Sequence, residues 1–405
     1  MKKLQKILFF TEYYYPAQNT TSYYLTDIIR TAASVWKGDM KIYTASDLGN
    51  NKEILQQDNV SVKRFSSGNL NKNSLLMRLC KFGLISLQFA WNALWNVSSG
   101  DTVFTVTNPA FMLVFFALFR KVKKFNYILL VYDIFPEVLI PAGLTSPNSF
   151  MYRLTLQIYN WAYRQVDELI VIGRDMKEVV EQKVGKSSNI TLLTNWVDVK
   201  NIFPETGSEN EILKDLHLTN KRIFSLAGNM GRTQGLENLL KGIEILPSDE
   251  KIHFLLMGDG AYGKNIEHFI SEHPQINLTY TGRIKKEQQS AMLNAGDIAI
   301  ISLDSNMYGL SVPSKSYFNM AAGKPLLLIA EENSEIAIMI KEHKLGWVVP
   351  PGDPDGLAQT IQKISLLSDD ELTNYGQRSR KIAEDYYSAE KVLEKYKELF
   401  KQYSF

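Results

Sequence analysis

Short apolar runs alternate with longer amphipathic stretches along most of this 405-residue chain. This alternation predicts parallel sheets covered by helices, because two parallel strands need a long crossover between them. The alternation occurs twice, and the more polar residues 199–219 separate the two series. The chain is also longer than one typical hydrophobic core supports. The expected fold class is therefore α/β, with two doubly wound domains in tandem. If the two sheets face each other, the active site lies in the cleft between them.

The expected elements are defined by hydrophobic periodicity and by the turn residues between them. In the first series the strands are expected at 6–11, 40–43, 102–106, 127–131, 168–172 and 190–193. The longest helices there are expected at 74–95, 148–164 and 174–184. In the second series the strands are expected at 223–227, 253–257, 278–281, 298–301, 326–329 and 347–349. Asp353 is expected to cap a helix that begins at Pro354, and an amphipathic helix is expected at 389–403.

Charge is distributed unevenly, although the net charge is only +2. Residues 60–130 contain a single acid, Asp101, and these basic residues: Lys63, Arg64, Lys72, Arg78, Lys81, Arg120, Lys121, Lys123 and Lys124. The apolar residues of the expected helix 74–95 cover more than one narrow stripe. Together these features predict docking of segment 74–124 on an anionic membrane surface. The alternative is a core helix with basic ends, and no recognisable module supports nucleic-acid binding.

Two further observations concern the compartment. Cys80 is the only cysteine, so the chain forms no internal disulfide, which fits a reducing compartment. The longest uninterrupted apolar run covers residues 111–119, which is much shorter than a membrane span.

The candidate binding residues follow strands of the second series, where ligands of such sheets bind. The loop 309–325 places Lys315 at the start of a helix, and that combination suits a diphosphate. Arg232 and Arg283 follow two other strands, so the three cations are expected to converge on one anion. The alternative is a set of ordinary strand-to-helix turns. Residues 258–263 match G-x-G-x-x-G, but Arg283 replaces the acid that a dinucleotide site needs at the end of the next strand.

Carboxylates follow a buried-looking strand of the first series. Asp133 and Glu137 are expected at its carboxyl end, where catalytic groups of such sheets lie. The alternative for this segment is an Asp turn before a Pro-started helix. Asn19, Thr20 and Thr21 follow the first strand and are expected to line the cleft, where they can donate hydrogen bonds. All histidines occur at His217 or later, which argues against a Ser-His-Asp or zinc-hydrolase site in the first half.

The chain resembles glycosyltransferase family 4, the GT-B enzymes, and within it the bacterial surface-polysaccharide transferases of the fucosaminyltransferase-like branch. The segments that carry the resemblance occur in the family's order over nearly the whole chain. They are Tyr14-Tyr15-Pro16, Asn19-Thr20-Thr21, Asp133-Ile134-Phe135-Pro136-Glu137, Gly228-Asn229-Met230-Gly231, Gln234-Gly235-Leu236, Gly258-Asp259-Gly260, Val312-Pro313-Ser314-Lys315, Ala321-Ala322-Gly323-Lys324-Pro325 and 346–353.

The resemblance implies a retaining hexosyltransferase that needs no metal or other cofactor beyond its nucleotide-sugar co-substrate, which is expected to be UDP-linked. It implies an acceptor-binding domain at 1–203, a nucleotide-sugar-binding domain at 204–384 and a C-terminal helix at 385–405 that packs back on the first domain. The expected donor-binding residues are Gly231, Arg232, Gln234, Gly258, Gly260, Arg283, Pro313, Ser314 and Lys315. Asp133, Glu137 and Lys315 are the expected catalytic residues.

The chain departs from the family pattern at one motif in particular. Many members carry Glu-x7-Glu before the Ala-Ala-Gly segment, and Leu310 and Phe318 stand at those positions here. Tyr132 also replaces a frequent histidine, and Gln234 replaces the usual lysine. The diphosphate charge is therefore expected to be balanced by Arg232, Arg283 and Lys315.

The expected function is sugar transfer from a UDP-sugar to a lipid-linked saccharide during O-antigen or capsule biosynthesis. The expected location is cytoplasmic, with peripheral association at the inner face of the cytoplasmic membrane. The alternatives are a sugar-nucleotide epimerase with the same two-domain plan, or a non-catalytic membrane-associated scaffold.

Overall fold

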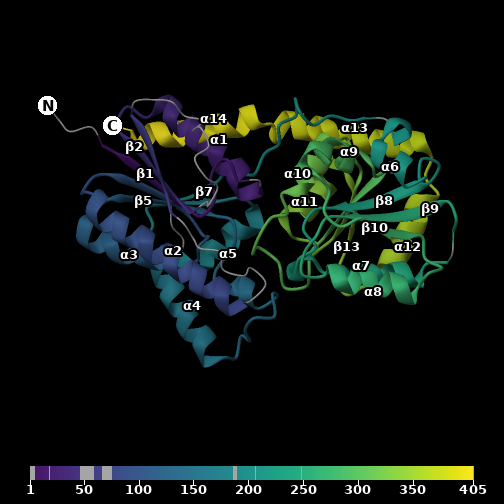
Figure 1. The fold of residues 1–405 in the computed structure, drawn as a ribbon, viewed down its shortest axis with the longest axis horizontal. Helices are drawn as coiled ribbons and strands as arrows, with labels where there is room; N and C mark the ends of the chain where they lie inside the picture. Colours follow the sequence, from purple (N-terminus) through teal and green to yellow (C-terminus); the bar gives the residue numbers. More distant parts are fainter. Residues whose placement is uncertain are drawn as a thin grey trace. The chain divides into compact units, whose positions relative to one another are not determined.

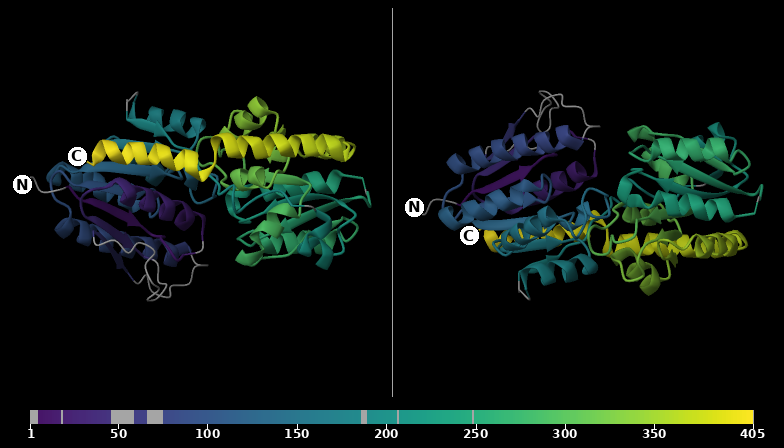
Figure 2. Two further views of the ribbon diagram at one scale, coloured as in Figure 1. Left: turned by 90° about the horizontal axis from the view of Figure 1, so that it is seen from above. Right: turned by 90° about the horizontal axis from the view of Figure 1, so that it is seen from below.

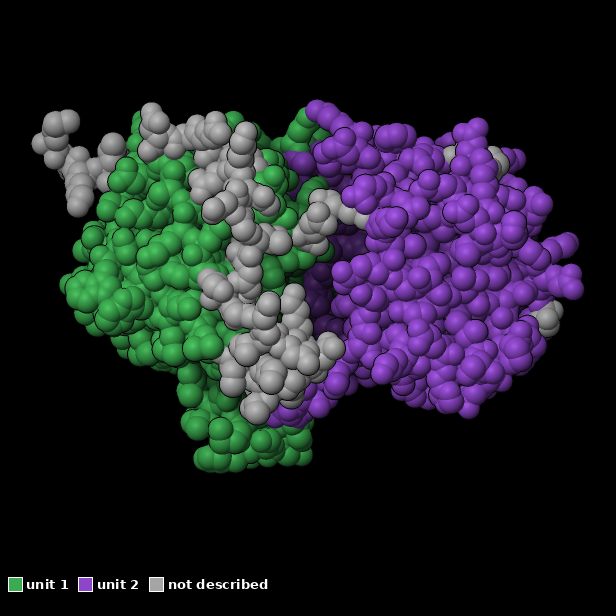
Figure 3. All heavy atoms as spheres, in the orientation of Figure 1, with its two compact units in different colours: residues 1–138, 146–194, 390–405 green, residues 139–145, 195–389 purple. Residues whose placement is uncertain are grey.

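The computed structural model of the protein describes residues 5–17, 19–45, 59–65, 75–185, 189–205, 207–247 and 249–404. The chain forms two compact units, which Figure 3 shows in different colours. The first unit contains residues 1–138, 146–194 and 390–405, and the second contains residues 139–145 and 195–389.

In the first part of the chain, up to β7, strands are mostly separated by helices (Figure 1). The strands are β1 (Ile7–Thr11), β2 (Met40–Thr44), β3 (Val60–Arg64), β4 (Thr102–Val106), β5 (Asn126–Val131), β6 (Glu168–Val171) and β7 (Ile190–Leu192). The helices are α1 (Thr20–Val35), α2 (Leu75–Asn96), α3 (Phe111–Lys123), η1 (Glu137–Leu139), α4 (Phe150–Tyr163) and α5 (Arg174–Val184).

The remaining elements form the second unit and the final helix. The strands are β8 (Arg222–Ala227), β9 (Ile252–Met257), β10 (Leu278–Tyr280), β11 (Ile298–Ser302), β12 (Leu326–Ile329) and β13 (Gly346–Val349). The longer helices are α7 (Leu236–Ile245), α8 (Gly263–Glu272), α11 (Glu335–His343), α12 (Pro354–Ser365), α13 (Asp369–Tyr386) and α14 (Ala389–Tyr403). The short helices are η2 (Gly207–Glu209), α6 (Glu211–Asp215), η3 (Arg232–Gln234), η4 (Lys286–Gln288), α9 (Gln289–Asn294) and α10 (Lys315–Ala321).

Each unit is built on one parallel sheet. The seven-stranded sheet has the order β3-β2-β1-β4-β5-β6-β7, and the six-stranded sheet has the order β10-β9-β8-β11-β12-β13. Neighbouring strands pair in parallel in both sheets. The strand order reverses direction next to β1 and next to β8, and such reversals place ligand sites at the carboxyl ends of the strands. The predicted α/β class with two doubly wound sheets is confirmed.

The core of the first unit follows from the two-residue period of β1. Phe10 packs against Phe89 of α2 and Phe116 of α3, with ring centroids 5.8 and 4.8 Å away. Phe9 points to the opposite face and meets Phe400 of α14 at 6.2 Å. Consecutive side chains of a strand face opposite sides, so β1 connects two helical layers. Helix α14, yellow in Figures 1 and 2, therefore covers part of the first sheet.

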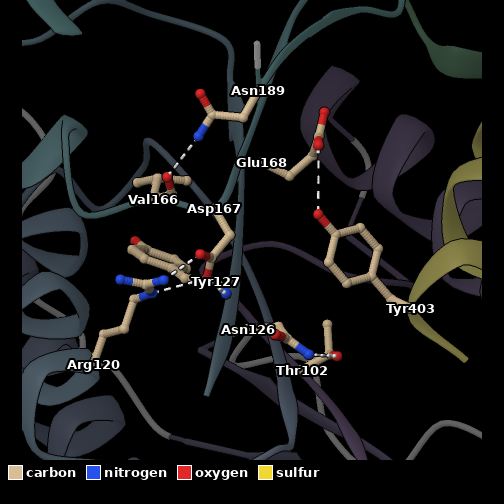
Figure 4. Close-up of polar contacts among 9 residues, drawn as sticks. All are labelled: Thr102, Arg120, Asn126, Tyr127, Val166, Asp167, Glu168, Asn189 and Tyr403. Atoms are coloured by element: carbon tan, nitrogen blue, oxygen red, sulfur yellow. Dashed lines mark hydrogen bonds and ion pairs between the residues drawn. The ribbon is translucent and has the colours of Figure 1, made fainter. Parts of the chain in front are cut away.

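An ionic contact anchors α3 to this sheet (Figure 4). Arg120 donates from Nε to Asp167 Oδ2 at 2.8 Å, and its other nitrogen Nη2 pairs with Oδ1. The same Oδ2 accepts the backbone N–H of Tyr127 at 2.8 Å. On the far side of the strand, the Tyr403 hydroxyl donates to Glu168 Oε2 at 3.4 Å and ties α14 to β6. The guanidinium group of Arg120 thus forms its ion pair within the first unit.

The structure departs from the predicted strands at one element and agrees with a predicted helix cap. Strand β3 was missed because its side chains are alternately half-buried and exposed at the sheet edge, so it lacks a continuous apolar run. Asp353 caps α12 as predicted, and its Oδ1 accepts the N–H of Gly356 at 2.8 Å. Across the described ranges, no helix is both long enough and apolar enough to cross a bilayer.

Candidate functional site

Backbone contacts hold two glycine loops together at the carboxyl edge of the second sheet. The Met230 N–H donates to Asp259 O at 2.9 Å, and the Gly228 N–H donates to Met257 O at 2.8 Å. Gly258 has φ +141°, and a Cβ there would lie 1.8 Å from Gly228 O. A Cβ on Gly260 would lie 2.4 Å from Met230 O. These glycines are therefore required for loop packing before any ligand is considered.

A third loop, between β11 and α10, joins the same edge. The Asp304 N–H donates to Thr233 O at 2.9 Å, and a Cβ on Gly235 would lie only 2.7 Å from Leu303 O. Lys315 Nζ donates to Gln234 Oε1 at 2.6 Å. Lys315 and Gln234, which belong to separate sequence motifs and were both expected at the site, are thus in direct contact.

Lys315 is buried enough to affect its charge. Burial lowers the pKa of the Lys315 ammonium from 10.5 to about 8, because the charged form loses solvation. Within the described residues no carboxylate forms an ion pair with it. An anion placed against Nζ would restore the lost electrostatic stabilisation. The site therefore presents an ammonium group whose charge is not already neutralised.

The other two predicted cations differ from Lys315. Arg283 forms an ion pair with Asp259 at 2.9 Å, and its side chain is 79% exposed. Because Asp259 belongs to the loop after β9, this pair connects the end of β10 to the same edge. Arg232 is exposed in η3, two residues before Gln234. The carbonyl groups of Pro313 and Ser314 accept the N–H groups of Ser316 and Tyr317, so they form the first turn of α10.

In the first unit, Asp133 lies where β4 and β5 end. Its N–H and that of Tyr132 both donate to Thr107 Oγ1, each at 3.2 Å. Burial raises the pKa of the Asp133 carboxyl from 3.8 to about 6. Among the described side chains none forms an ion pair with it. A carboxyl with this pKa accepts a proton near neutral pH more readily than an exposed one.

Glu137 has a different environment from Asp133. It forms an ion pair with Lys183 of α5, whose side chain is only 4% exposed. Lys183 also lies 5.2 Å from the ring centroid of Tyr163. Desolvation lowers the pKa of Lys183, and Glu137 opposes that shift. Glu137 is thus held by a buried structural contact.

The residues after β1 form a helix start. Asn19 caps α1, with Oδ1 accepting the Ser22 N–H at 2.8 Å. Thr20 is exposed and Thr21 is partly exposed in the first turn. The amide nitrogen of Asn19 and these two hydroxyl groups can therefore meet a ligand.

Glu331 is a candidate that sequence reasoning missed. It follows β12 by two residues, and its Oε1 accepts the N–H of Asn306 at 2.8 Å. Its Oε2 is buried and has no hydrogen-bond partner in the described part of the chain. Its position just after a strand of this sheet was the available signal, because the ends of β8, β11 and β12 are neighbours.

Two Rossmann-like sheets with polar loops at their carboxyl edges define the GT-B class of fold. The family described as glycosyl transferases group 1 matches residues 208–382. The probable glycosyltransferase WbjE of Pseudomonas aeruginosa is 34% identical over 393 residues, covering 97% of each chain. The protein belongs to the group 1 glycosyltransferases, the family-4 type with the GT-B fold, and it is a glycosyltransferase.

Two further relatives extend the comparison. The putative colanic acid biosynthesis glycosyl transferase WcaI of Escherichia coli K12 is 22% identical over 301 residues, covering 73% of this chain and 72% of WcaI. The structure of Anabaena HepE in complex with UDP-glucose matches with a TM-score of 0.72 and 16% identity, covering 98% of this chain and 99% of HepE. At this identity, the likeness to HepE shows that the two chains share a fold.

Replacing Lys183 by Met is expected to destabilise the protein by about 3 kcal/mol, because Glu137 keeps its charge in a poorly solvated place. Urea unfolding measures the change. The double variant Glu137→Gln with Lys183→Met should recover most of that loss. If Lys183→Met and the double variant both match the wild type in urea unfolding, the pair has no structural role.

Proposed function

We propose that the protein is a retaining, metal-independent hexosyltransferase that moves a sugar from a UDP-sugar to a lipid-linked saccharide. The reaction would take place at the inner face of the cytoplasmic membrane, during O-antigen or capsule biosynthesis. The observation that carries the proposal is the unneutralised Lys315 ammonium held by Gln234 at a carboxyl edge. HepE in complex with UDP-glucose supports the donor class, and the printed name of WcaI supports polysaccharide synthesis.

Charge stabilisation is the main task of such an enzyme. As the donor's bond to the diphosphate breaks, negative charge grows on the leaving group, and fixed cations stabilise it. We assign this task to Lys315, with Arg232 and Arg283 as further cations. Gln234 would hold Nζ in position, and Pro313 and Ser314 would shape the turn that carries it. The glycines Gly231, Gly258 and Gly260 would let the backbone approach the donor.

The acceptor needs a group that binds its hydroxyl. Asp133 would orient that hydroxyl or accept its proton, because it is the carboxylate here without an ion-pair partner in the described residues. Glu137 would support the same segment through its contact with Lys183. Asn19, Thr20 and Thr21 would contact the acceptor saccharide.

Membrane association through segment 74–124 is part of the proposal. Fewer basic side chains of this segment are available to lipid than the sequence predicts. Lys81 pairs with Glu12 at 3.5 Å, and Arg120 pairs with Asp167. Lys123 Nζ donates to Val97 O at 2.7 Å. Lys121 and Lys124 are exposed, and Lys72 and the side chain of Arg78 lie outside the described residues.

A panel of sugar nucleotides, scored by UDP release with and without membrane lipid extract, tests the proposed function. Release that requires the extract, together with a labelled lipid product, supports it. Conversion of the donor without extract would instead favour an epimerase, and no turnover with any donor would favour a non-catalytic scaffold.

Lys315→Met is expected to weaken UDP binding about tenfold or more, as loss of a charge-assisted contact predicts. The wild-type affinity should fall as pH rises above about 8, because only protonated Lys315 attracts the diphosphate. The diphosphate of UDP keeps its full charge there, since its phosphate has a second pKa near 6, and the same titration in Lys315→Met removes any contribution of the uracil ring. Calorimetry from pH 7 to 9.5 measures both effects.

The control is Lys341→Met, which removes an exposed lysine paired with Glu332. It should keep the wild-type affinity and pH profile. A Lys315→Met protein that binds UDP like the wild type at every pH would contradict the assignment.

Asp133→Asn is expected to lower kcat by roughly 10²- to 10⁴-fold, which is the usual contribution of a general base. In the wild type the rate should fall as pH drops through about 6, because the protonated carboxyl accepts no proton. A pH–rate profile measures this, and the low-pH decline should vanish in the variant. Asp355→Asn, at an exposed position, is the control. A residual low-pH decline in Asp133→Asn would assign it to another group.

A further inference from the structure

An exposed apolar stripe runs along α2. Inward-facing residues such as Ile85 and Phe89 are fully buried. The opposite side carries large apolar residues, all at least 40% exposed, at the spacing of one helix face: Leu84, Leu87, Trp91, Leu94 and Trp95. The rings of Trp91 and Trp95 lie 5.9 Å apart. Tryptophan is typical of the boundary between water and lipid.

The stripe does not end with α2. Helix α3 packs between α2 and α4, on the same side of the first sheet (Figures 1 and 2). Its outer side exposes Phe111, Leu118 and Val122. Helix α4 follows with Phe150 (77% exposed), Met151 (66%), Leu154 and Ile158, again on one helical face. The sequence prediction was limited to residues 74–124 and did not include α4.

Charge on these helices has one sign. None of α2, α3 and α4 contains an acidic residue. Arg153 of α4 and Lys121 of α3 are exposed beside the apolar residues. Lys121 lies 5.1 Å from the ring centroid of Trp161, which links α3 to α4. Basic residues around exposed aromatic side chains complement an anionic lipid surface.

We propose that α2, α3 and α4 form one lipid-docking face, and that Phe150, Met151 and Leu154 of α4 insert among the acyl chains. Exposed apolar area on this scale is costly in water and becomes favourable when lipid covers it. The occupant is a bilayer rich in anionic phospholipid. This face deepens the membrane association in the proposed function, but lipid binding requires no sugar transfer.

Flotation of the full-length protein with vesicles tests the face. The wild type should bind phosphatidylglycerol vesicles, and bind phosphatidylcholine vesicles less. A Phe150→Glu, Leu154→Glu variant should lose about tenfold or more in the partition coefficient. Two apolar side chains that would lie among the acyl chains become charged in this variant. Leu366→Glu, at an 86% exposed position in the second unit, is the control and should float like the wild type.

Other outcomes overturn the proposal. Wild-type protein that stays unbound to anionic vesicles, or a variant that binds as well as the wild type, excludes insertion of α4. A wild-type dimer that the same variant makes monomeric, with no vesicle binding, assigns the face to a second copy. Circular dichroism confirms that the variant is folded, and UDP release with membrane lipid extract dispersed in detergent, without vesicles, reports on the proposed function separately.

A second inference concerns Glu331, and it rests on the proposed function. Its Oε1 holds the backbone of Asn306, while Oε2 is buried without a partner among the described residues. A buried carboxylate oxygen without a hydrogen bond is costly, so it indicates a ligand that donates to it. The loop containing Asn306 also carries Asp304, which bonds to the loop of Gln234.

We infer that Glu331 accepts hydrogen bonds from hydroxyl groups of the donor. The donor's ribose and sugar both carry such hydroxyl groups, and the acidic pair expected from the family is replaced by Leu310 and Phe318. Glu331 would supply a carboxylate from the neighbouring strand end. It is a positioning residue for the donor.

Glu331→Gln should raise the KM for the donor about tenfold and leave kcat nearly unchanged, as loss of one charged hydrogen bond predicts. Glu332→Gln is the matched control, because Glu332 is exposed and pairs with Lys341. Equal KM values for the two variants would overturn the inference, as would a lower melting temperature without a change in KM. Wild-type turnover tests the proposed function independently of either variant.

Discussion

The close approach of two glycine backbones is the constraint on which the second unit's functional edge depends. Gly258 lies so near the carbonyl of Gly228 that any side chain would collide with it. This contact brings the loops after β8 and β9 together, and the loop after β11 then docks against the first of them. The Lys315–Gln234 and Arg283–Asp259 contacts are built on these three loops. The backbone thus determines where the cations lie before any ligand binds.

Much of the fold follows from sequence because buried parallel strands leave a strong pattern. The expected strands at 102–106 and 326–329 coincide with β4 and β12, and most others differ by one residue at an end. Strand β3 was missed, and it shows where prediction from apolar runs fails. An edge strand buries only part of its side chains, so its alternation is weak and its polar residues resemble a loop.

The proximity of the candidate loops was predictable for the same reason, since strand ends in a parallel sheet mark a common edge. The partners of each side chain were not predictable. Lys81 counted as a surface cation in the sequence, yet it turns inward to Glu12. Glu137 looked equivalent to Asp133, yet Lys183 engages it from a helix far along the chain. A count of charged residues does not show which of them are exposed to solvent, because tertiary packing decides that.

The position of α14 has a consequence for synthesis on the ribosome. Phe9 and Phe104 belong to the first strands made, while Phe400, which packs against both, is among the last residues. Translation of the intervening residues takes on the order of ten seconds or longer. During that interval one face of the nascent first sheet lacks its covering helix. A chaperone that shields apolar surface would therefore have its longest opportunity to act on the N-terminal half, before the C-terminal helix emerges.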